Sequence, residues 1–267
     1  MTDSLRRAFR LPEPQSTPGT PTAAKATPSA RPDPLAVTLA NGTTFSAVDR
    51  AALAQEAAKA LKLGADVPGR VQDGPTCGLY ALGMVMDYWE VKDPTTAESP
   101  LVVDADTWRR DSHSLTPDTK YRLFDEAKKA GFTTQGEMFY ARQLGQLAEQ
   151  FGFKSKVTEN FTVKDLHAAI DQGHPVLVAF DVDNHGNPGL FGGSRAHWAV
   201  IEGHFDKDGT EYLVATHGWT GKEYVWRADD LMASVNQLNA SDFPAAPKDI
   251  TKTLRGLMVE VTPKATA

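Results

Sequence analysis

The 267-residue chain contains a single cysteine, so it cannot form a disulfide bond within itself. It has no cluster of basic residues, and its formal net charge of −6 argues against a nucleic-acid-binding protein. No apolar run reaches the length of a membrane-spanning helix, and no secretory signal sequence is recognisable. We therefore expect a protein located in the cytoplasm, with no nucleic-acid or membrane partner.

Large apolar residues are also scarce in residues 1–36, which instead hold seven of the seventeen prolines. A segment of this composition buries too little apolar surface to offset the conformational entropy lost on ordering. We predict a disordered tail over 1–36, a linker and an amphipathic helix over 37–70, and a folded domain over 71–263. Three arginines lie within the first ten residues, and a basic start is also a feature of export signals. The alternative is therefore that the tail directs export of the protein as an effector.

The folded domain changes from a helical pattern in its first half to a strand-like pattern in its second half. Apolar spacing and glycine or proline boundaries predict helices over 79–89, 117–130, 138–151, 163–172 and 229–238. Strands are expected over 153–158, 175–180, 198–205, 212–216, 223–227 and 257–261. Helices followed by an antiparallel sheet imply an α+β fold in which a helical layer packs on the sheet.

The only cysteine, Cys77, stands at the start of the first helix of this domain. Gly74 and Pro75 favour a turn before it, and Thr76 can cap the first backbone N–H groups of the helix. A sulfur at a helix N-terminus faces the positive end of the helix dipole, which favours the reactive thiolate. The side-chain amide of Gln72 could reach back over this sulfur. The alternative is a small buried apolar side chain with no chemical role.

A cysteine nucleophile needs a base, and His197 is the best placed of the seven histidines. It begins a predicted strand directly after a glycine-rich loop, a position from which a base can face a cleft. A third group usually orients the base, and on the next strand His217 could do so as a neutral hydrogen-bond acceptor. We expect the remaining histidines of polar or turn segments to be surface residues: His113, His167, His174 and His204.

Other kinds of site fit the sequence poorly. The segment from Asp181 to Gly192 is a weak match to a calcium loop, because it has a histidine at the third ligand position and a glycine at the twelfth. A zinc site built from His197 and His204 would lack thiolates and the usual spacing. We therefore expect neither a metal ion nor another cofactor.

Four blocks make the chain resemble the actin maturation protease family, within the papain-like and bacteriocin-processing types of cysteine peptidase. The resemblance extends from about Val71 to Pro244, and its first and third blocks are the most specific. The blocks are 72–79 (QDGPTCGL), 136–139 (GEMF), 183–185 (DNH) leading to 196–200 (AHWAV), and 234–238 (SVNQL) followed by 242–244 (DFP).

The resemblance implies that Cys77 is the nucleophile, His197 the base and Gln72 the donor that binds the oxyanion. It implies a papain-like fold, no cofactor, and a protein or peptide substrate such as the N-terminus of actin, trimmed in the manner of an aminopeptidase. The third catalytic position falls near His217, where this type of enzyme has an amide or a carboxylate. That departure leaves the orienting role open.

We predict from the sequence an α+β, papain-like cysteine peptidase that hydrolyses peptide bonds by a Cys–His mechanism. One alternative keeps the Cys–His pair but changes the group that the cysteine attacks. It is a deamidase or transglutaminase-type effector that acts on glutamine side chains. The other alternative is an inactive peptidase fold that binds peptides or partner proteins, an alternative kept open by His217 at the orienting position.

Overall fold

A computed structural model describes residues 37–38, 44–45, 57, 60, 63, 67–72, 74–92, 123–221 and 223–264. The predicted tail over 1–36, most of the predicted amphipathic helix and the loop between the first two helices of the domain lie outside these residues. The chain divides into two units, residues 1–47 and 48–267. In the first, two short strands, β1 (Val37–Thr38) and β2 (Thr44–Phe45), pair antiparallel. The second unit contains the candidate site.

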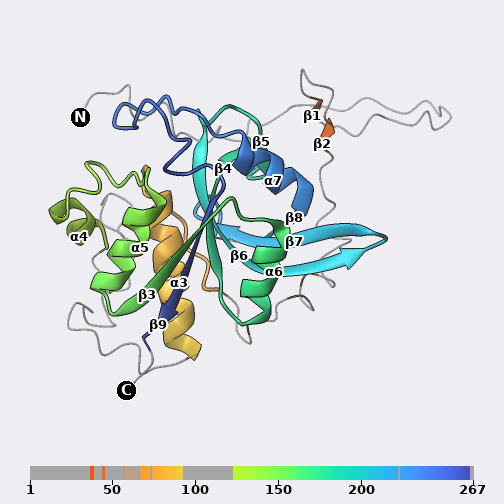
Figure 1. Cartoon of the computed structure of the whole chain (residues 1–267), viewed down its shortest axis with the longest axis horizontal. Helices are drawn as coiled ribbons and strands as arrows, with labels where there is room; N and C mark the ends of the chain where they lie inside the picture. Colours follow the sequence, from red (N-terminus) through yellow and green to blue (C-terminus); the bar gives the residue numbers. More distant parts are fainter. Residues whose placement is uncertain are drawn as a thin grey trace, which may run out of the picture. The chain divides into compact units, whose positions relative to one another are not determined.

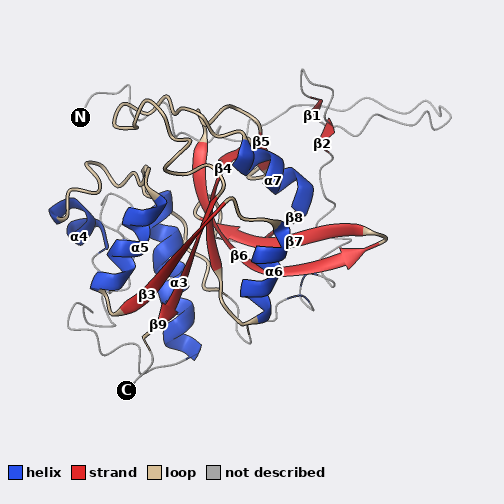
Figure 2. Ribbon diagram, viewed as in Figure 1, coloured by secondary structure: helices blue, strands red, loops and turns tan. Residues whose placement is uncertain are grey.

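One antiparallel sheet dominates the described part of the second unit (Figure 2). Its strand order is β3-β9-β4-β6-β7-β8, and β5 pairs with β4 beside this path. The strands are β3 (Phe153–Glu159), β4 (Val176–Val182), β5 (Pro188–Gly189), β6 (Ala196–Lys207), β7 (Thr210–His217), β8 (Glu223–Arg227) and β9 (Leu257–Pro263). The strand β9 is the last in sequence, yet in the sheet it lies between β3 and β4. Figure 1 shows it beside β3.

Helices cover the sheet. They are α3 (Cys77–Lys92), α4 (Leu123–Lys129), α5 (Ala141–Gln150), α6 (Val163–Asp171) and α7 (Ala228–Asn236). Every residue of β4 is buried. Because successive side chains of a strand point to opposite faces, both faces of the sheet are covered at β4.

The helix α3 is the central helix of the domain and packs against β6, β7, β9 and β4. All of its residues from Leu79 to Tyr88 are buried. A helix that is apolar on all sides is stable only when it is surrounded, and here α4, α5 and the sheet surround it. Truncation of Leu82, which is fully buried, to alanine would cost about 2–5 kcal/mol of stability.

The sequence-based assignment of fold class is confirmed: the structure is α+β, with the cysteine-bearing helix packed on an antiparallel sheet. The predicted strands all occur, with bounds that shift by a few residues, and Asp208–Gly209 forms the turn of a hairpin between β6 and β7. The helix predicted from 117 begins outside the described residues. No helix among those described is both long enough and apolar enough to cross a membrane.

Three of the four histidines expected at the surface, His167, His174 and His204, are partly exposed. The rings of His167 and His204 stack with their centroids 3.8 Å apart, because α6 packs against β6. His174 Nδ1 lies 3.3 Å from a carboxylate oxygen of Glu260. His113 lies outside the described residues.

Candidate active site

Cys77 occupies the first position of α3, as the sequence predicts. The preceding Thr76 is fully buried, and its carbonyl accepts the first helical hydrogen bond from Tyr80 N at 2.9 Å. Gly74 has φ +64°, a conformation that favours glycine and turns the chain into the helix. The backbone N–H groups of Trp198, Gly78 and Cys77 itself point at the sulfur. The Trp198 contact places the thiol beside the strand that carries His197.

Burial raises the pKa of the Cys77 thiol to about 11, and the hydrogen bonds from the three backbone N–H groups oppose this shift only in part. The direction is the reverse of the one predicted from the helix dipole alone. The sulfur of this partly exposed residue lies between α3 and β6, where little water remains to solvate a thiolate. The resting side chain is therefore a neutral thiol.

The start of α3 is packed tightly against the loop before α5. A Cβ atom at Gly78 would lie 2.8 Å from Met138 Cβ and 3.0 Å from Trp198 Cδ1, so no side chain fits there. The indole Nε1 of Trp198 donates to Met138 O at 2.8 Å. These contacts hold the helix start, the loop and β6 together around the sulfur.

Glu137 organises the same loop from within. Its carboxylate accepts hydrogen bonds from Thr133 Oγ1 at 2.9 Å, Thr134 N at 2.9 Å and Gln135 N at 2.7 Å, and also from the hydroxyl of Thr134. Burial tends to raise the pKa of Glu137, but the hydrogen bonds outweigh it and the pKa is lowered. Sequence analysis included Glu137 only as part of a resemblance block and assigned it no role.

His197 and His217 lie on adjacent strands, β6 and β7, and form a direct hydrogen bond. The distance from His197 Nε2 to His217 Nδ1 is 3.0 Å, and His217 Nε2 lies 3.0 Å from the carbonyl oxygen of Gly186. A carbonyl oxygen only accepts, so His217 donates through Nε2–H, and in the neutral ring its Nδ1 is then an acceptor. His197 must then donate through Nε2–H, which leaves the lone pair on His197 Nδ1. The Gly186 carbonyl thus selects the tautomer of both rings.

Both rings are held in an aromatic environment. His217 stacks on Tyr224 with centroids 4.2 Å apart, and His197 meets Phe180 and Trp219 edge-on at 5.8 and 5.9 Å. Gly186 has φ +84°, and a Cβ there would lie 2.5 Å from the Tyr224 ring. Burial, together with the neighbouring His217, lowers the pKa of His197 well below its ordinary value, so the His197 ring is neutral.

Gln72 lies against the residue that follows His217. Its backbone N donates to Gly218 O at 2.7 Å, and a Cβ at Gly218 would lie 2.4 Å from Gln72 Oε1. One side-chain N–H of Gln72 donates to Gly74 O at 3.0 Å, which ties the amide to the turn before Cys77. The buried Oε1 atom has no hydrogen-bond partner among the described residues. The second N–H remains available as a donor.

The structure links the four predicted residues, in part through their sequence neighbours. Cys77 contacts the residue next to His197, His197 bonds to His217, and Gln72 bonds to the residue next to His217. In chemical terms the set contains a thiol, two imidazole rings joined by a hydrogen bond, and a side-chain amide.

Asp181 is a site residue that sequence analysis did not identify. It is fully buried in β4, and its carboxylate accepts hydrogen bonds from the backbone N of Phe191 at 2.9 Å, Gly193 at 2.8 Å and Arg195 at 3.0 Å. It therefore shapes the glycine-rich loop that leads into His197. A single acidic residue within an otherwise apolar strand was the available signal.

Metal binding has no support within the described part of the chain, where no group of three or more His, Cys, Asp or Glu side chains could hold an ion. Asp183, the second carboxylate of the apparent calcium loop, accepts hydrogen bonds from the backbone N of His185 at 2.7 Å and Asn187 at 2.8 Å. It shapes the turn that carries Gly186.

Comparison with known proteins adds sequence relatives to this geometry. The chain is 31% identical to human actin maturation protease over 144 residues, which cover 52% of this chain and 34% of the human protein. It is 32% identical to actin maturation protease of Xenopus tropicalis over 142 residues, covering 51% and 39%. For the Drosophila melanogaster protein of the same name the identity is 28% over 173 residues, covering 63% and 54%. The matched regions thus span about a third to a half of these relatives.

Among solved structures, the chain is similar to a putative C39-like peptidase from Bacillus anthracis. The TM-score is 0.46 at 12% identity, covering 78% of this chain and 98% of that one.

A family profile described as the C-terminal domain of actin maturation protease-like proteins matches residues 67–205, a range that includes Gln72, Cys77 and His197. Since this match extends over just over half of the chain, the chain belongs to the actin maturation protease-like family.

Proposed function

We propose that this protein is a cysteine peptidase that hydrolyses peptide bonds with Cys77 as nucleophile and His197 as base. The observation that carries the proposal is the hydrogen-bonded chain from Gly186 O through His217 to His197. This chain leaves His197 Nδ1 unprotonated on a ring that is buried and fixed, which is the form a general base requires.

In the proposed reaction the thiol proton moves to His197 Nδ1 as the sulfur attacks the carbonyl carbon of the substrate. The S–C bond forms, the carbonyl π electrons move onto oxygen, and His197 becomes an imidazolium stabilised by the acceptor Nδ1 of His217. The imidazolium then protonates the leaving amine as the C–N bond breaks, giving a thioester. Water, deprotonated by His197, cleaves the thioester and restores the thiol. The high pKa of the thiol fits a mechanism in which the proton leaves during attack.

The developing oxyanion would be bound by the free N–H of Gln72 and the backbone N–H of Cys77. Gln72 is held by Gly218 and Gly74, so its amide is placed before the substrate arrives. Each such donor contributes about 3 kcal/mol to stabilisation of the transition state in enzymes of this kind.

For the substrate, we propose a protein or peptide, with N-terminal trimming of a protein such as actin as the specific form. The relatives' name, actin maturation protease, supports this specific form. Fold and catalytic residues do not determine the substrate, and the match covers only part of each relative.

The test is incubation of the full chain with a peptide library that includes acetylated, actin-like N-termini, followed by intact-mass analysis. Cleavage by the wild type and its absence in Cys77→Ser and His197→Ala variants that melt at the wild-type temperature would support the proposal. Loss of ammonia from glutamine side chains without backbone cleavage would instead identify the deamidase or transglutaminase alternative. Peptide binding without any mass change would identify an inactive binding module.

The inactive alternative rested on a histidine at the orienting position. His217 is a suitable substitute for an amide there, because its Nδ1 accepts the hydrogen bond that an amide oxygen would accept. This geometry favours the active enzyme.

A further inference from the structure

Glu202 is a fully buried acidic residue of β6 that has no part in the proposed reaction. It lies at an irregularity of the sheet. Ile201 pairs with Ala215 and Gly203 pairs with Val214, so Glu202 is an extra residue that forms a β-bulge. A bulge changes the direction in which a side chain points, and bulges are common beside active sites. Burial of a carboxylate is unfavourable unless it is hydrogen-bonded, so the partners of Glu202 deserve inspection.

The carboxylate of Glu202 joins two parts of the chain that are distant in sequence. Its Oε2 accepts a hydrogen bond from Val67 N at 3.1 Å, and its Oε1 accepts one from the hydroxyl of Thr216. Thr216 belongs to β7, whereas Val67 begins the segment 67–72, which ends at Gln72. Glu202 therefore links β7 to the segment that carries the proposed oxyanion donor.

The Gln72 segment (residues 67–72) forms neither a helix nor a strand, so its position depends on contacts with other elements. A Cβ atom at Gly69 would lie 1.8 Å from Gly221 O, so the two backbones are in direct contact there. The Arg70 side chain donates to a carboxylate oxygen of Asp87 in α3 at 3.1 Å. The segment is thus held along its length, and the buried carboxylate holds its first residue.

Both ends of the Gln72 segment are attached at the end of β7. At one end Val67 is joined to Thr216 through Glu202. At the other end Gln72 N donates to Gly218 O at 2.7 Å, two residues after Thr216. The position of Gln72 relative to β7 is therefore fixed from two sides, and Glu202 supplies one of them.

Glu202 acts on the site from behind the sheet. Successive side chains of a strand point to opposite faces, so Thr216 and His217 point to opposite faces of β7. Because the carboxylate of Glu202 bonds to the Thr216 hydroxyl, it lies on the face away from the His217 ring. It can affect the reaction only through the residues that it holds.

We propose that Glu202 is a positioning residue that places the Gln72 amide for oxyanion binding, by joining Val67 N to the Thr216 hydroxyl. The inference rests on the proposed peptidase function and adds a residue to it. Glu202 takes no part in the bond-breaking steps. Because the oxyanion develops only in the transition state, loss of this positioning should lower kcat and leave KM nearly unchanged.

The test compares Glu202→Met with Glu202→Gln on a peptide that the wild type cleaves. Methionine keeps the approximate shape of the side chain but removes both acceptors. Glutamine keeps both links, because its oxygen can accept from Val67 N while its N–H donates to the Thr216 hydroxyl. We expect kcat to fall about tenfold in Glu202→Met, with KM within about twofold of the wild type, and to stay near the wild-type value in Glu202→Gln.

A second comparison separates an effect through Gln72 from a general loosening of the domain. In a Gln72→Ala background, where no amide is left to position, Glu202→Met should lower kcat by less than about twofold. In a His217→Ala background it should retain its full effect. An equal fall in the wild-type and Gln72→Ala backgrounds, or an equal fall in the Met and Gln variants, would overturn the inference.

The matched control is Glu260→Met. Glu260 is also a buried carboxylate on a central strand of the sheet, but its partners are Lys156 and His174. Its replacement should lower stability in urea and leave kcat unchanged at a temperature where the variant is folded. A fall in kcat equal to that of Glu202→Met would show that loss of any buried carboxylate slows the enzyme, and would overturn the inference.

The remaining outcomes distinguish this inference from the proposed function. If Glu202→Met does not fold, Thr216→Val removes one of the two links and should show a smaller fall in kcat that again depends on Gln72. An unchanged kcat in a folded variant of either kind would overturn the role of Glu202. If Gln72→Ala keeps the wild-type kcat, the inference fails while the Cys–His peptidase stands. If the wild type cleaves no peptide, the proposed function itself fails.

Discussion

The two ends of helix α3 are built in opposite ways. At its start, around Cys77, polar groups are left with unused capacity: the buried Gln72 Oε1 has no partner among the described residues, and the thiol is held neutral with its pKa raised to about 11. Glycine at 78 and 218 lets the neighbouring segments approach more closely than side chains would allow. The environment there keeps reactive groups close together.

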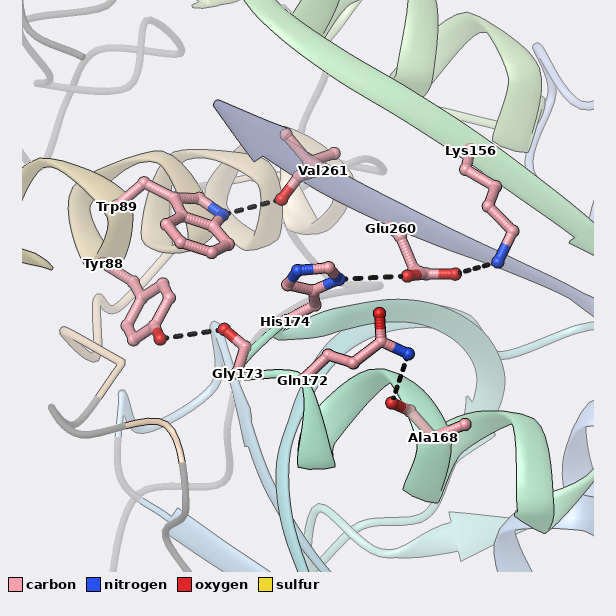
Figure 3. A network of polar contacts seen from close by, with 9 residues as sticks. All are labelled: Tyr88, Trp89, Lys156, Ala168, Gln172, Gly173, His174, Glu260 and Val261. Atoms are coloured by element: carbon pink, nitrogen blue, oxygen red, sulfur yellow. Dashed lines mark hydrogen bonds and ion pairs between the residues drawn. The ribbon is translucent and has the colours of Figure 1, made fainter. Parts of the chain in front are cut away.

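At the far end of α3 the polar groups are paired (Figure 3). The hydroxyl of Tyr88 lies 2.8 Å from Leu63 O and 2.9 Å from Gly173 O, and Trp89 Nε1 donates to Val261 O at 2.6 Å. Beside them Glu260 bridges His174 at 3.3 Å and Lys156 Nζ at 2.6 Å, as Figure 3 shows. Burial raises the pKa of Tyr88 to about 12, so its hydroxyl stays a donor.

The comparison indicates that the two ends of α3 have different roles, one in stability and the other in chemistry. Paired hydrogen bonds at the end of α3 anchor it to β9 and to the segment after α6, and this anchoring stabilises the domain. The start of the helix can then hold groups whose hydrogen-bonding capacity is not filled, which is the condition for binding a substrate. Substitutions at the start should therefore change chemistry, and substitutions at the far end should change stability.

The largest effect should appear in the alkylation of Cys77 by iodoacetamide. Because the thiol pKa is raised to about 11, the rate should rise about tenfold per pH unit, or about a thousandfold between about pH 7 and about pH 10. In denaturant the midpoint should return to about 8.5. A rate that is already maximal below about pH 7 would contradict a neutral resting thiol and would favour the thiolate predicted from the helix dipole.

Next in size should be the effect of His217. His217→Ala removes the acceptor that holds the His197 ring, and kcat should fall by about 10- to 100-fold with little change in KM. His217→Asn should retain most activity, because the asparagine Oδ1 can accept the hydrogen bond from His197 that His217 Nδ1 accepts. Full activity in a folded Ala variant would remove His217 from the mechanism.

At the far end of α3, Trp89→Phe should act on stability alone. It removes the donor to Val261 O and leaves a buried carbonyl unpaired, which should lower the free energy of unfolding by about 1–3 kcal/mol. Urea denaturation measures the loss, and kcat/KM at a temperature where the variant is folded should match the wild type. Tyr88→Phe provides a second variant of the same kind. A change in kcat in either variant would contradict the statement that the far end of α3 affects stability alone.

The smallest effect should come from Glu137, at the reactive end. Glu137→Gln should lower stability at neutral pH by roughly 1 kcal/mol, because an amide cannot accept all the hydrogen bonds that the carboxylate accepts. The folded-state pKa lies below the ordinary value of 4.5, so the stabilisation is complete above about that pH and is lost as pH falls through the folded value. Unfolding curves of the two proteins should therefore converge in acid. A difference in the free energy of unfolding that is the same at all pH values would show that the charge of Glu137 is not the source of the stabilisation.

Local patterns accounted for most of the fold and part of the site. The continuous apolar run of β4 predicts a buried strand, and the Gly-Pro-Thr turn before Cys77 predicts a helix start, because both signals arise within a few residues. His197 was identified for the same reason, as it follows a glycine-rich loop and begins a strand.

Contacts between distant segments account for what sequence reasoning missed. The group that orients both histidines is the carbonyl of Gly186, a backbone atom that no side-chain pattern reveals. Asp181 acts on a loop ten to fourteen residues away by accepting backbone N–H groups. The thiol pKa was predicted in the wrong direction because the helix dipole is visible in sequence, whereas desolvation by β6 is not.

The place of β9 in the sheet also has a consequence for the order of synthesis. This strand separates β3 from β4 and receives the indole of Trp89, which lies 172 residues earlier in the chain. At roughly 5–20 residues per second, a ribosome needs on the order of 10–35 s to make the intervening segment. During that time the segment of α3 has been synthesised, but the strand that anchors its far end has not. The domain can therefore complete its sheet only when nearly all of the described chain has been translated.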